Sequence, residues 1–215
     1  MCADQYLRSQ TQPGLTVLGL ALAYGLATAI MVSAFAHISG AHLNPAVTIG
    51  CWVTKRVGTI QAIFYCLAQL LGGIAGAYLL TAIVAEQIWR PIGLGTPDLP
   101  SDFTRWHAML LEGVLAFVLV IAYFATILDE RGTLNKVGGF AVGLAVSAEV
   151  LAATAFLGGT VATGASAINP ARTLGTALAS WHWRGHGVFW VGPLFGGVVA
   201  AVIYDRLFLA DQPPA

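Results

Sequence analysis

Apolar residues come in long runs along this chain, separated by short polar segments. No Asp, Glu, Lys or Arg lies between Arg8 and Lys55, and none lies from Val57 to Ala85. A bilayer core about 30 Å thick is crossed by about 20 helical residues. The pattern therefore predicts five full membrane-spanning helices, at about 14–37, 59–82, 107–128, 137–156 and 187–208.

Two further apolar segments, at about 44–54 and 169–180, are too short to cross a bilayer. As helices they would reach about 15–18 Å, half of the hydrocarbon core. Each opens on Asn-Pro-Ala, at Asn44 and at Asn169, so the chain contains an internal repeat with an offset of 125 residues. Short apolar pieces at equivalent places of a repeat indicate half-helices that line a polar path.

The two halves of the repeat are predicted to have opposite orientations, because three full spans separate the motifs. The half-helices then point their N-termini at each other near the midplane. The basic residues divide into Lys55, Arg56, Arg131, Lys136 and Arg206 on one side and Arg8, Arg90, Arg105 and Arg184 on the other. This slight excess predicts a cytoplasmic C-terminus.

Composition supports one transmembrane domain over residues 1–215, with a polar N-terminal segment at 1–13. Hydrophobic residues make up 57% of the chain and charged residues 9%, which is more apolar surface than a water-soluble domain of this size can bury. Ten acidic and ten basic residues balance, so the charge gives no case for nucleic acid. The three cysteines lack metal-ligand or redox spacing, and we expect neither a metal nor a cofactor.

The paired motifs, Asn44-Pro45-Ala46 and Asn169-Pro170-Ala171, carry the chemistry. One Asn-Pro-Ala is an ordinary helix start, since Asn caps helices well and Pro suits the first helical position. Two that face each other add partial positive charge at the midplane, which repels cations and hydronium. The two Asn amides can also donate to a water between them and so interrupt a proton-conducting file. The sequence predicts a pore for neutral solutes that excludes protons.

Arg172 follows the second motif directly, about one turn outward from the midplane. A buried Arg is costly in lipid and must face a cavity or a partner. We interpret it as a pore-lining donor that also repels cations, in preference to an Arg that snorkels to the outer interface.

Residues 37–48, 164–172 and 189–193 resemble the aquaporin, or major intrinsic protein, family, and the resemblance covers about 15–210. It implies an all-α membrane protein with an aquaporin-like inverted repeat, here of five full helices and two re-entrant half-helices. It also implies a homotetramer, and we place the protein in a plasma (inner) membrane.

The resemblance further implies a narrow constriction formed by Tyr24, Val150, Ser166 and Arg172. Strict water channels usually carry His at the position of Val150, and a smaller apolar side chain there widens the constriction and removes a donor. Residues 157–163 form an insertion relative to the common family loop. We therefore predict a passive channel for water that also admits glycerol, urea or ammonia.

Two other classes of function compete with a channel. The alternative is a non-conducting, truncated membrane protein with a structural or assembly role, against which the intact Asn, Pro and Arg positions argue. An enzyme is not expected, because the chain lacks a His-Glu-x-x-His zinc motif, a paired intramembrane aspartate motif and a serine nucleophile loop.

Three polar residues near the motifs are predicted to support the loops. The resemblance implies that Glu112 accepts hydrogen bonds from the loop before the second motif. His42 is expected to bond the backbone of its own loop. Glu149, next to Val150, has two open interpretations: it braces the half-helix at 169–180, or it reaches the outer interface.

The family has six full spans, and the first of them has no match here. We expect it to lie upstream of Met1. In the other interpretation the chain is naturally shorter, and one flank of the pore is open to lipid unless a neighbour covers it, which is costly for loop backbone.

Overall fold

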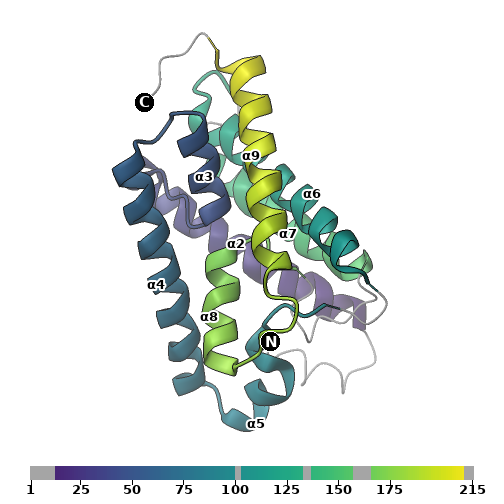
Figure 1. The fold of residues 1–215 in the computed structure, drawn as a ribbon. Helices are drawn as coiled ribbons and strands as arrows, with labels where there is room; N and C mark the ends of the chain where they lie inside the picture. Colours follow the sequence, from purple (N-terminus) through teal and green to yellow (C-terminus); the bar gives the residue numbers. More distant parts are fainter. Residues whose placement is uncertain (1–12, 100–102, 133–136, 157–165, 211–215) are drawn as a thin grey trace.

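The computed structural model describes residues 13–99, 103–132, 137–156 and 166–210, and these residues form helices and no strand. Five helical segments are long and apolar enough to cross a membrane, as predicted (Figure 1). They are α2 (Pro13–Ser39), α4 (Thr59–Ile83), α6 (Arg105–Tyr123) with its continuation η2 (Phe124–Leu128), α7 (Gly138–Phe156) and α9 (Val188–Phe208). Most of the polar segment at 1–13, the insertion at 157–163, Arg8 and Lys136 lie outside the described residues.

The two half-helices are α3 (Pro45–Val53) and α8 (Pro170–Ser180), and they confirm the predicted re-entrant pair. They stand almost end to end in the middle of the bundle, with their N-termini facing each other (Figure 1). The Asn44 side chain caps α3 by accepting from Ala46 N at 2.9 Å, and the Asn169 side chain caps α8 by accepting from Ala171 N at 3.0 Å. Pro at the first helical position removes an N–H that would otherwise lack a partner there.

Glycines let each half-helix pack closely on a full span of the other half. A Cβ added to Gly73 of α4 would lie 2.3 Å from Ala171 O of α8. A Cβ added to Gly197 of α9 would lie 3.0 Å from Ala46 O of α3. Because Ala46 and Ala171 are equivalent in the repeat, the packing follows the same two-fold relation as the sequence.

The pairing of α6 with α9 depends on Gly196, and we expect its replacement to separate these helices. In Gly196→Ala the new Cβ would lie 1.9 Å from Gly113 O, so the backbones must move apart. Overpacking of this kind costs about 1–3 kcal/mol of stability. Thermal unfolding in detergent should therefore occur at lower temperature in this variant.

Gly76→Ala is the matched control, since Gly76 is also inside a helix, but no described atom beyond the adjacent backbone of that helix lies within 4 Å of the added Cβ. It should unfold at the wild-type temperature or slightly above, because Ala favours helix over Gly. Equal destabilisation by the two changes would contradict the packing role of Gly196.

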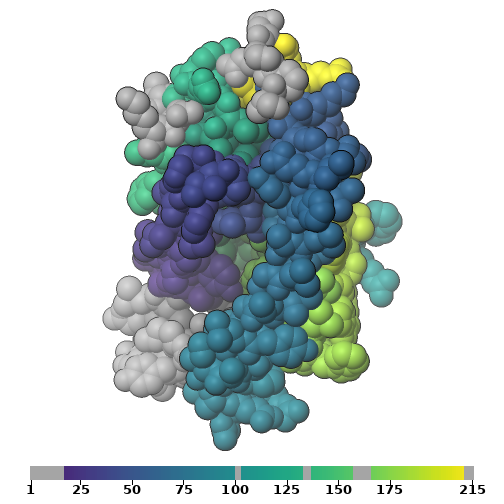
Figure 2. Space-filling view, turned by 90° about the vertical axis from the view of Figure 1, so that its left-hand side faces the viewer, coloured from purple at the N-terminus to yellow at the C-terminus, as the bar shows by residue number. Residues whose placement is uncertain are grey.

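The two halves of the repeat are unevenly covered. Gly196 of α9 meets Gly113 of α6, whereas a Cβ added to Gly72 of α4, at the corresponding place beside Gly73, would have no described neighbour from another element within 4 Å. Only 6% of the apolar window in α4 is buried, against 44% in α9. In Figure 2, α4 runs along the face of the molecule turned toward the viewer, beside α2. Among the described residues, the first half has no counterpart of α6.

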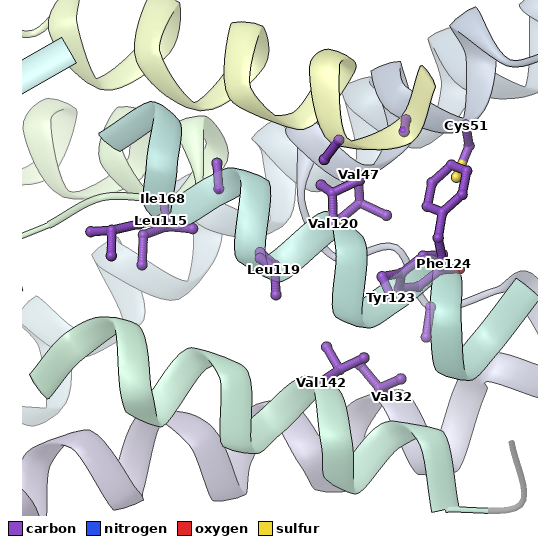
Figure 3. Packing of buried hydrophobic residues seen from close by; sticks show 14 of the residues in the cluster. Val32, Val47, Cys51, Leu115, Leu119, Val120, Tyr123, Phe124, Val142 and Ile168 are labelled. Atoms are coloured by element: carbon purple, nitrogen blue, oxygen red, sulfur yellow. The ribbon is translucent and has the colours of Figure 1, made fainter. Parts of the chain in front are cut away.

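The apolar core lies along α6, between the layer of α9 and α3 and the layer of α7 and α2. Leu119 and Val120 project from α6 into this core, and Val32 and Val142 approach each other across from Leu119 (Figure 3). Tyr123 at the end of α6 is fully buried. This core keeps α6 and α7 at a fixed distance from the half-helices.

Arg56 and Arg131 lie at one end of the bundle and Arg184 at the other, whereas Glu112, Glu149 and Arg172 lie inside it. Arg56 donates to Asp205 Oδ1 at 2.8 Å, which joins the loop after α3 to the end of α9. Arg131 also contacts this end, at the carbonyl of Phe208, and its hydrogen bonds lower the pKa of Asp129 to about 2. Arg184 lies at the other end, 3.7 Å from Asp98.

Candidate functional site

The two Asn-Pro-Ala motifs meet through reciprocal hydrogen bonds in the middle of the bundle. Asn44 Nδ2 donates to Ile168 O at 3.1 Å, and Asn169 Nδ2 donates to Leu43 O at 2.9 Å. Leu43 and Ile168 precede the two asparagines, and both have φ of 54°. Bulky residues rarely adopt this left-handed conformation, which marks a backbone held by its surroundings. Each loop thus presents a carbonyl oxygen to the asparagine of the other.

Each asparagine therefore has several roles at once. Its carbonyl oxygen caps its own half-helix, and one amide hydrogen reaches the opposite loop. A side-chain amide carries two donor hydrogens, so one hydrogen on each asparagine remains for another acceptor. Asn44 and Asn169 both line a cavity, and these two hydrogens are available to its contents.

That cavity has a volume of about 140 Å³ and lies between α2, α6, α7 and the two motif loops. The predicted residues that line it are Tyr24, His42, Asn44, Val150, Ser166, Asn169 and Arg172. The other predicted residues do not line the cavity and are buried beside it: Pro45, Ala46, Glu112, Pro170 and Ala171. The structure therefore brings the predicted side chains to one place and separates those that face the cavity from those that support it.

Arg172 is held in the cavity wall by three different elements. Its Nη1 donates to Ser166 O at 2.9 Å, and its Nη2 lies 3.1 Å from both Tyr24 Oη and Gly95 O. The guanidinium carbon also lies 5.3 Å from the centroid of the Tyr24 ring. Gly95 ends η1 (Arg90–Gly95), which follows the short helix α5 (Glu86–Trp89). These contacts hold Arg172 at the cavity and contradict the alternative of snorkelling to the interface.

Glu112 of α6 holds the loop that precedes the second motif. It is only 2% exposed. Its carboxylate accepts hydrogen bonds from Ser166 Oγ at 2.8 Å, Ala167 N at 2.9 Å and Ile168 N at 2.8 Å. Because these residues lead directly into Asn169, the carboxylate fixes the position from which α8 starts.

The expected backbone contact of His42 is wrong. Its Nδ1 instead shares a hydrogen bond of 3.0 Å with the hydroxyl of Thr48, one turn into α3. Gln69 of α4 donates to the same hydroxyl at 2.8 Å. The His42 ring packs edge-on against Tyr65 and Tyr123. Thr48 is near enough because Asn44 starts α3 only two residues after His42.

Two functional contacts had not been predicted. Tyr123 Oη donates to Gly40 O at 2.6 Å and so fixes the loop before the first motif. A tyrosine inside a predicted span was an available signal, since a buried hydroxyl needs a partner. The carbonyl of Gly95, which accepts from Arg172, belongs to the connection between α4 and α6, and no sequence pattern indicates its position.

Both interpretations of Glu149 are wrong. The side chain is 2% exposed, and neither carboxylate oxygen has a hydrogen-bond partner among the residues that the structure describes. It therefore neither braces α8 through a hydrogen bond nor reaches an interface. It lies in the cavity wall beside Val150.

The sequence model of the family described as "Major intrinsic protein" matches residues 2–204. Aquaporin TIP4-4 of Zea mays is 41% identical over 201 residues, which are 92% of this chain and 75% of that protein. Probable aquaporin TIP3-2 of Arabidopsis thaliana is 38% identical over 205 residues, 94% of this chain and 72% of that protein.

Among solved structures, the X-ray structure of the aquaglyceroporin from Plasmodium falciparum has a similar fold, with a TM-score of 0.71 and 27% identity. The similarity covers 92% of this chain and 86% of that one. The family match extends over nearly the whole sequence and agrees with the helices and half-helices described above. The chain belongs to the major intrinsic protein family, the aquaporins.

Proposed function

We propose that water and small neutral solutes cross the membrane through the cavity between the two Asn-Pro-Ala motifs. Its family and its aquaglyceroporin-like fold indicate that the chain is an integral membrane protein that acts as a passive channel. The observation that carries the residue assignment is the reciprocal pair of bonds from Asn44 to Ile168 and from Asn169 to Leu43. These bonds hold two helix N-termini head to head at one cavity.

Exclusion of protons and cations follows from this arrangement. Each half-helix N-terminus carries about half a positive charge, and both point toward the cavity. The free amide hydrogens of Asn44 and Asn169 orient a passing water with its oxygen toward them. Such a water cannot at the same time accept a proton from its neighbour, so the hydrogen-bonded file is interrupted there.

Tyr24, Val150, Ser166 and Arg172 form the proposed selectivity filter. Arg172 bonds the Tyr24 hydroxyl and the Ser166 carbonyl, so three of the four positions are in direct contact. Val150 completes the wall from α7 and brings no hydrogen-bonding side chain. A filter with one apolar wall admits solutes larger than water, which supports passage of glycerol, urea or ammonia beside water.

The test is osmotic shrinkage of proteoliposomes followed by light scattering. Vesicles that contain the protein should change volume severalfold faster than empty vesicles of the same lipid. Equal rates, with protein shown to be inserted and folded, would support the non-conducting alternative, which no observation on the described residues favours.

We expect Val150→His to narrow the filter. The larger imidazole adds a donor and reduces the free width, so glycerol and urea fluxes should fall about tenfold while water flux falls less than about twofold. The tenfold fall corresponds to a barrier for these solutes that is higher by about 1.4 kcal/mol. Solute and water permeabilities are measured on the same vesicles. Parallel loss of both would show that Val150 does not set the width.

The assembly and the membrane are also proposals. We expect four copies in one complex, each with its own pore, and a cytoplasmic C-terminus. The TIP-type relatives favour the tonoplast over the plasma membrane predicted from the sequence. The mass of the complex in detergent tests the number of copies. Fluorescence of a tagged chain in cells shows in which membrane the protein resides.

A further inference from the structure

Glu149 lies on the face of α7 that forms one wall of the pore. The residues of α7 that line the cavity are Val142, Val146, Glu149, Val150 and Thr154. Except for the adjacent pair at 149 and 150, they are three or four positions from one another. They therefore share one side of the helix. Glu149 is part of this stripe, halfway along it.

Within the described part of the chain, no group donates a hydrogen bond to the Glu149 carboxyl group. Its side chain is 2% exposed, and both oxygens are buried without a hydrogen bond. Glu112, equally buried, accepts three hydrogen bonds from the loop at 166–168. Because burial of a polar group without a bond is costly, an orphan carboxyl in a pore wall indicates a ligand that the pore supplies.

The other cavity-facing side chains of α7 do not compete for this ligand. Val142, Val146 and Val150 are apolar, and the Thr154 hydroxyl donates to Val150 O at 2.7 Å. Glu149 is thus the one acidic group and the one unsatisfied acceptor side chain among the described α7 residues of the stripe.

The same cavity presents a fixed donor group on another element. Arg172 lies in the wall at the start of α8, with its guanidinium held by Ser166, Tyr24 and Gly95. A cavity with a cationic donor and an unpartnered acceptor suits a molecule that has an acceptor oxygen and N–H donors at different ends. A small planar amide has that pattern.

We propose that Glu149 is a solute-contacting specificity residue of the pore, which accepts an N–H of a small neutral amide of the urea class. The carbonyl oxygen of the amide accepts from Arg172 in the same cavity. This inference rests on the proposed channel function and deepens it. Water depends less on Glu149, because a molecule with two donors and two acceptors finds partners all along the pore.

The experiment compares urea and water permeability of Glu149→Leu and Glu149→Gln in proteoliposomes. Urea flux is followed by light scattering after an iso-osmotic urea gradient, and water flux after a sucrose step. Loss of one hydrogen bond predicts a urea-to-water permeability ratio about five- to tenfold lower in Glu149→Leu. Glu149→Gln keeps an acceptor oxygen of the same reach, and its ratio should stay within about twofold of wild type.

Leu144→Ala is the matched control, since Leu144 is on α7 but half exposed outside the cavity, and its ratio should not change. An unchanged ratio in Glu149→Leu overturns this proposal, and so does equal loss of urea and water flux in both Glu149 variants, which is the result of a purely structural role. Wild-type vesicles that conduct water but not urea also overturn it and leave the channel function intact. Wild-type vesicles that conduct no water overturn the proposed function and this inference together.

Discussion

Replacing Arg172 with valine is expected to raise proton and cation leakage about 100-fold. A fixed charge about 4 Å from a passing cation contributes about 4 kcal/mol at an effective dielectric constant of 20, and removal of even part of this barrier is enough for that change. The variant also leaves Ser166 O, Tyr24 Oη and Gly95 O without their shared donor. Water flux should persist, because valine leaves a wider filter.

The leak is measured with a pH-sensitive dye inside proteoliposomes and with a potassium gradient. Arg172→Lys separates charge from geometry: lysine keeps the positive charge but cannot reproduce the planar fork. The leak of this variant should stay near wild type while its water flux falls. Arg90→Val removes an exposed arginine whose side chain bonds Glu86 in α5, and it should change neither flux. A tight Arg172→Val channel would show that Arg172 does not guard the pore.

Much of the fold could be predicted because lipid makes the pattern of spans simple. The predicted span at 14–37 is Pro13–Ser39 in the structure, and the predicted half-helix at 169–180 is Pro170–Ser180. Uncharged runs of about 20 residues indicate helices that cross the membrane. A capped apolar run of half that length indicates a half-helix that enters the membrane without crossing it. The inverted order then follows from counting spans between Asn44 and Asn169.

The detailed contacts of the site depend on tertiary placement that no local pattern encodes. Asn44 donates to Ile168, 124 residues away, and Leu43 and Ile168 have a left-handed backbone that their own side chains do not favour. His42 shares a hydrogen bond with the Thr48 hydroxyl because α3 starts beside it. Gly95 reaches Arg172 only because η1 folds back against α8. Glu149 is polar in a stripe of valines, and its role depends on the cavity it faces.

Glu112→Leu is expected to be the most damaging single change for stability. It removes the acceptor of Ser166 Oγ, Ala167 N and Ile168 N at once. Glu112 itself is only 2% exposed, so water cannot readily replace the carboxylate. A buried donor left without a partner costs about 1–3 kcal/mol, so the loss for three donors should be about 3–9 kcal/mol. The loop that carries Ser166 and Asn169 then lacks its anchor, and water flux should fall with stability.

Glu112→Gln tests whether the three bonds or the negative charge matter. Glutamine keeps one acceptor oxygen at the same reach but turns an NH₂ group toward at least one backbone N–H, so its loss of stability should be about half that of leucine. Glu86→Gln, at an exposed position that bonds Arg90, is the control and should unfold like wild type. Unfolding temperature in detergent and osmotic water flux are the measurements. If Glu112→Leu unfolds at the wild-type temperature, the carboxylate does not hold the loop. Glu112→Leu could also unfold at a lower temperature while its folded fraction conducts water like wild type. The bonds from Asn169 to Leu43 and from Arg172 to Ser166 would then be sufficient to position Asn169 without the carboxylate.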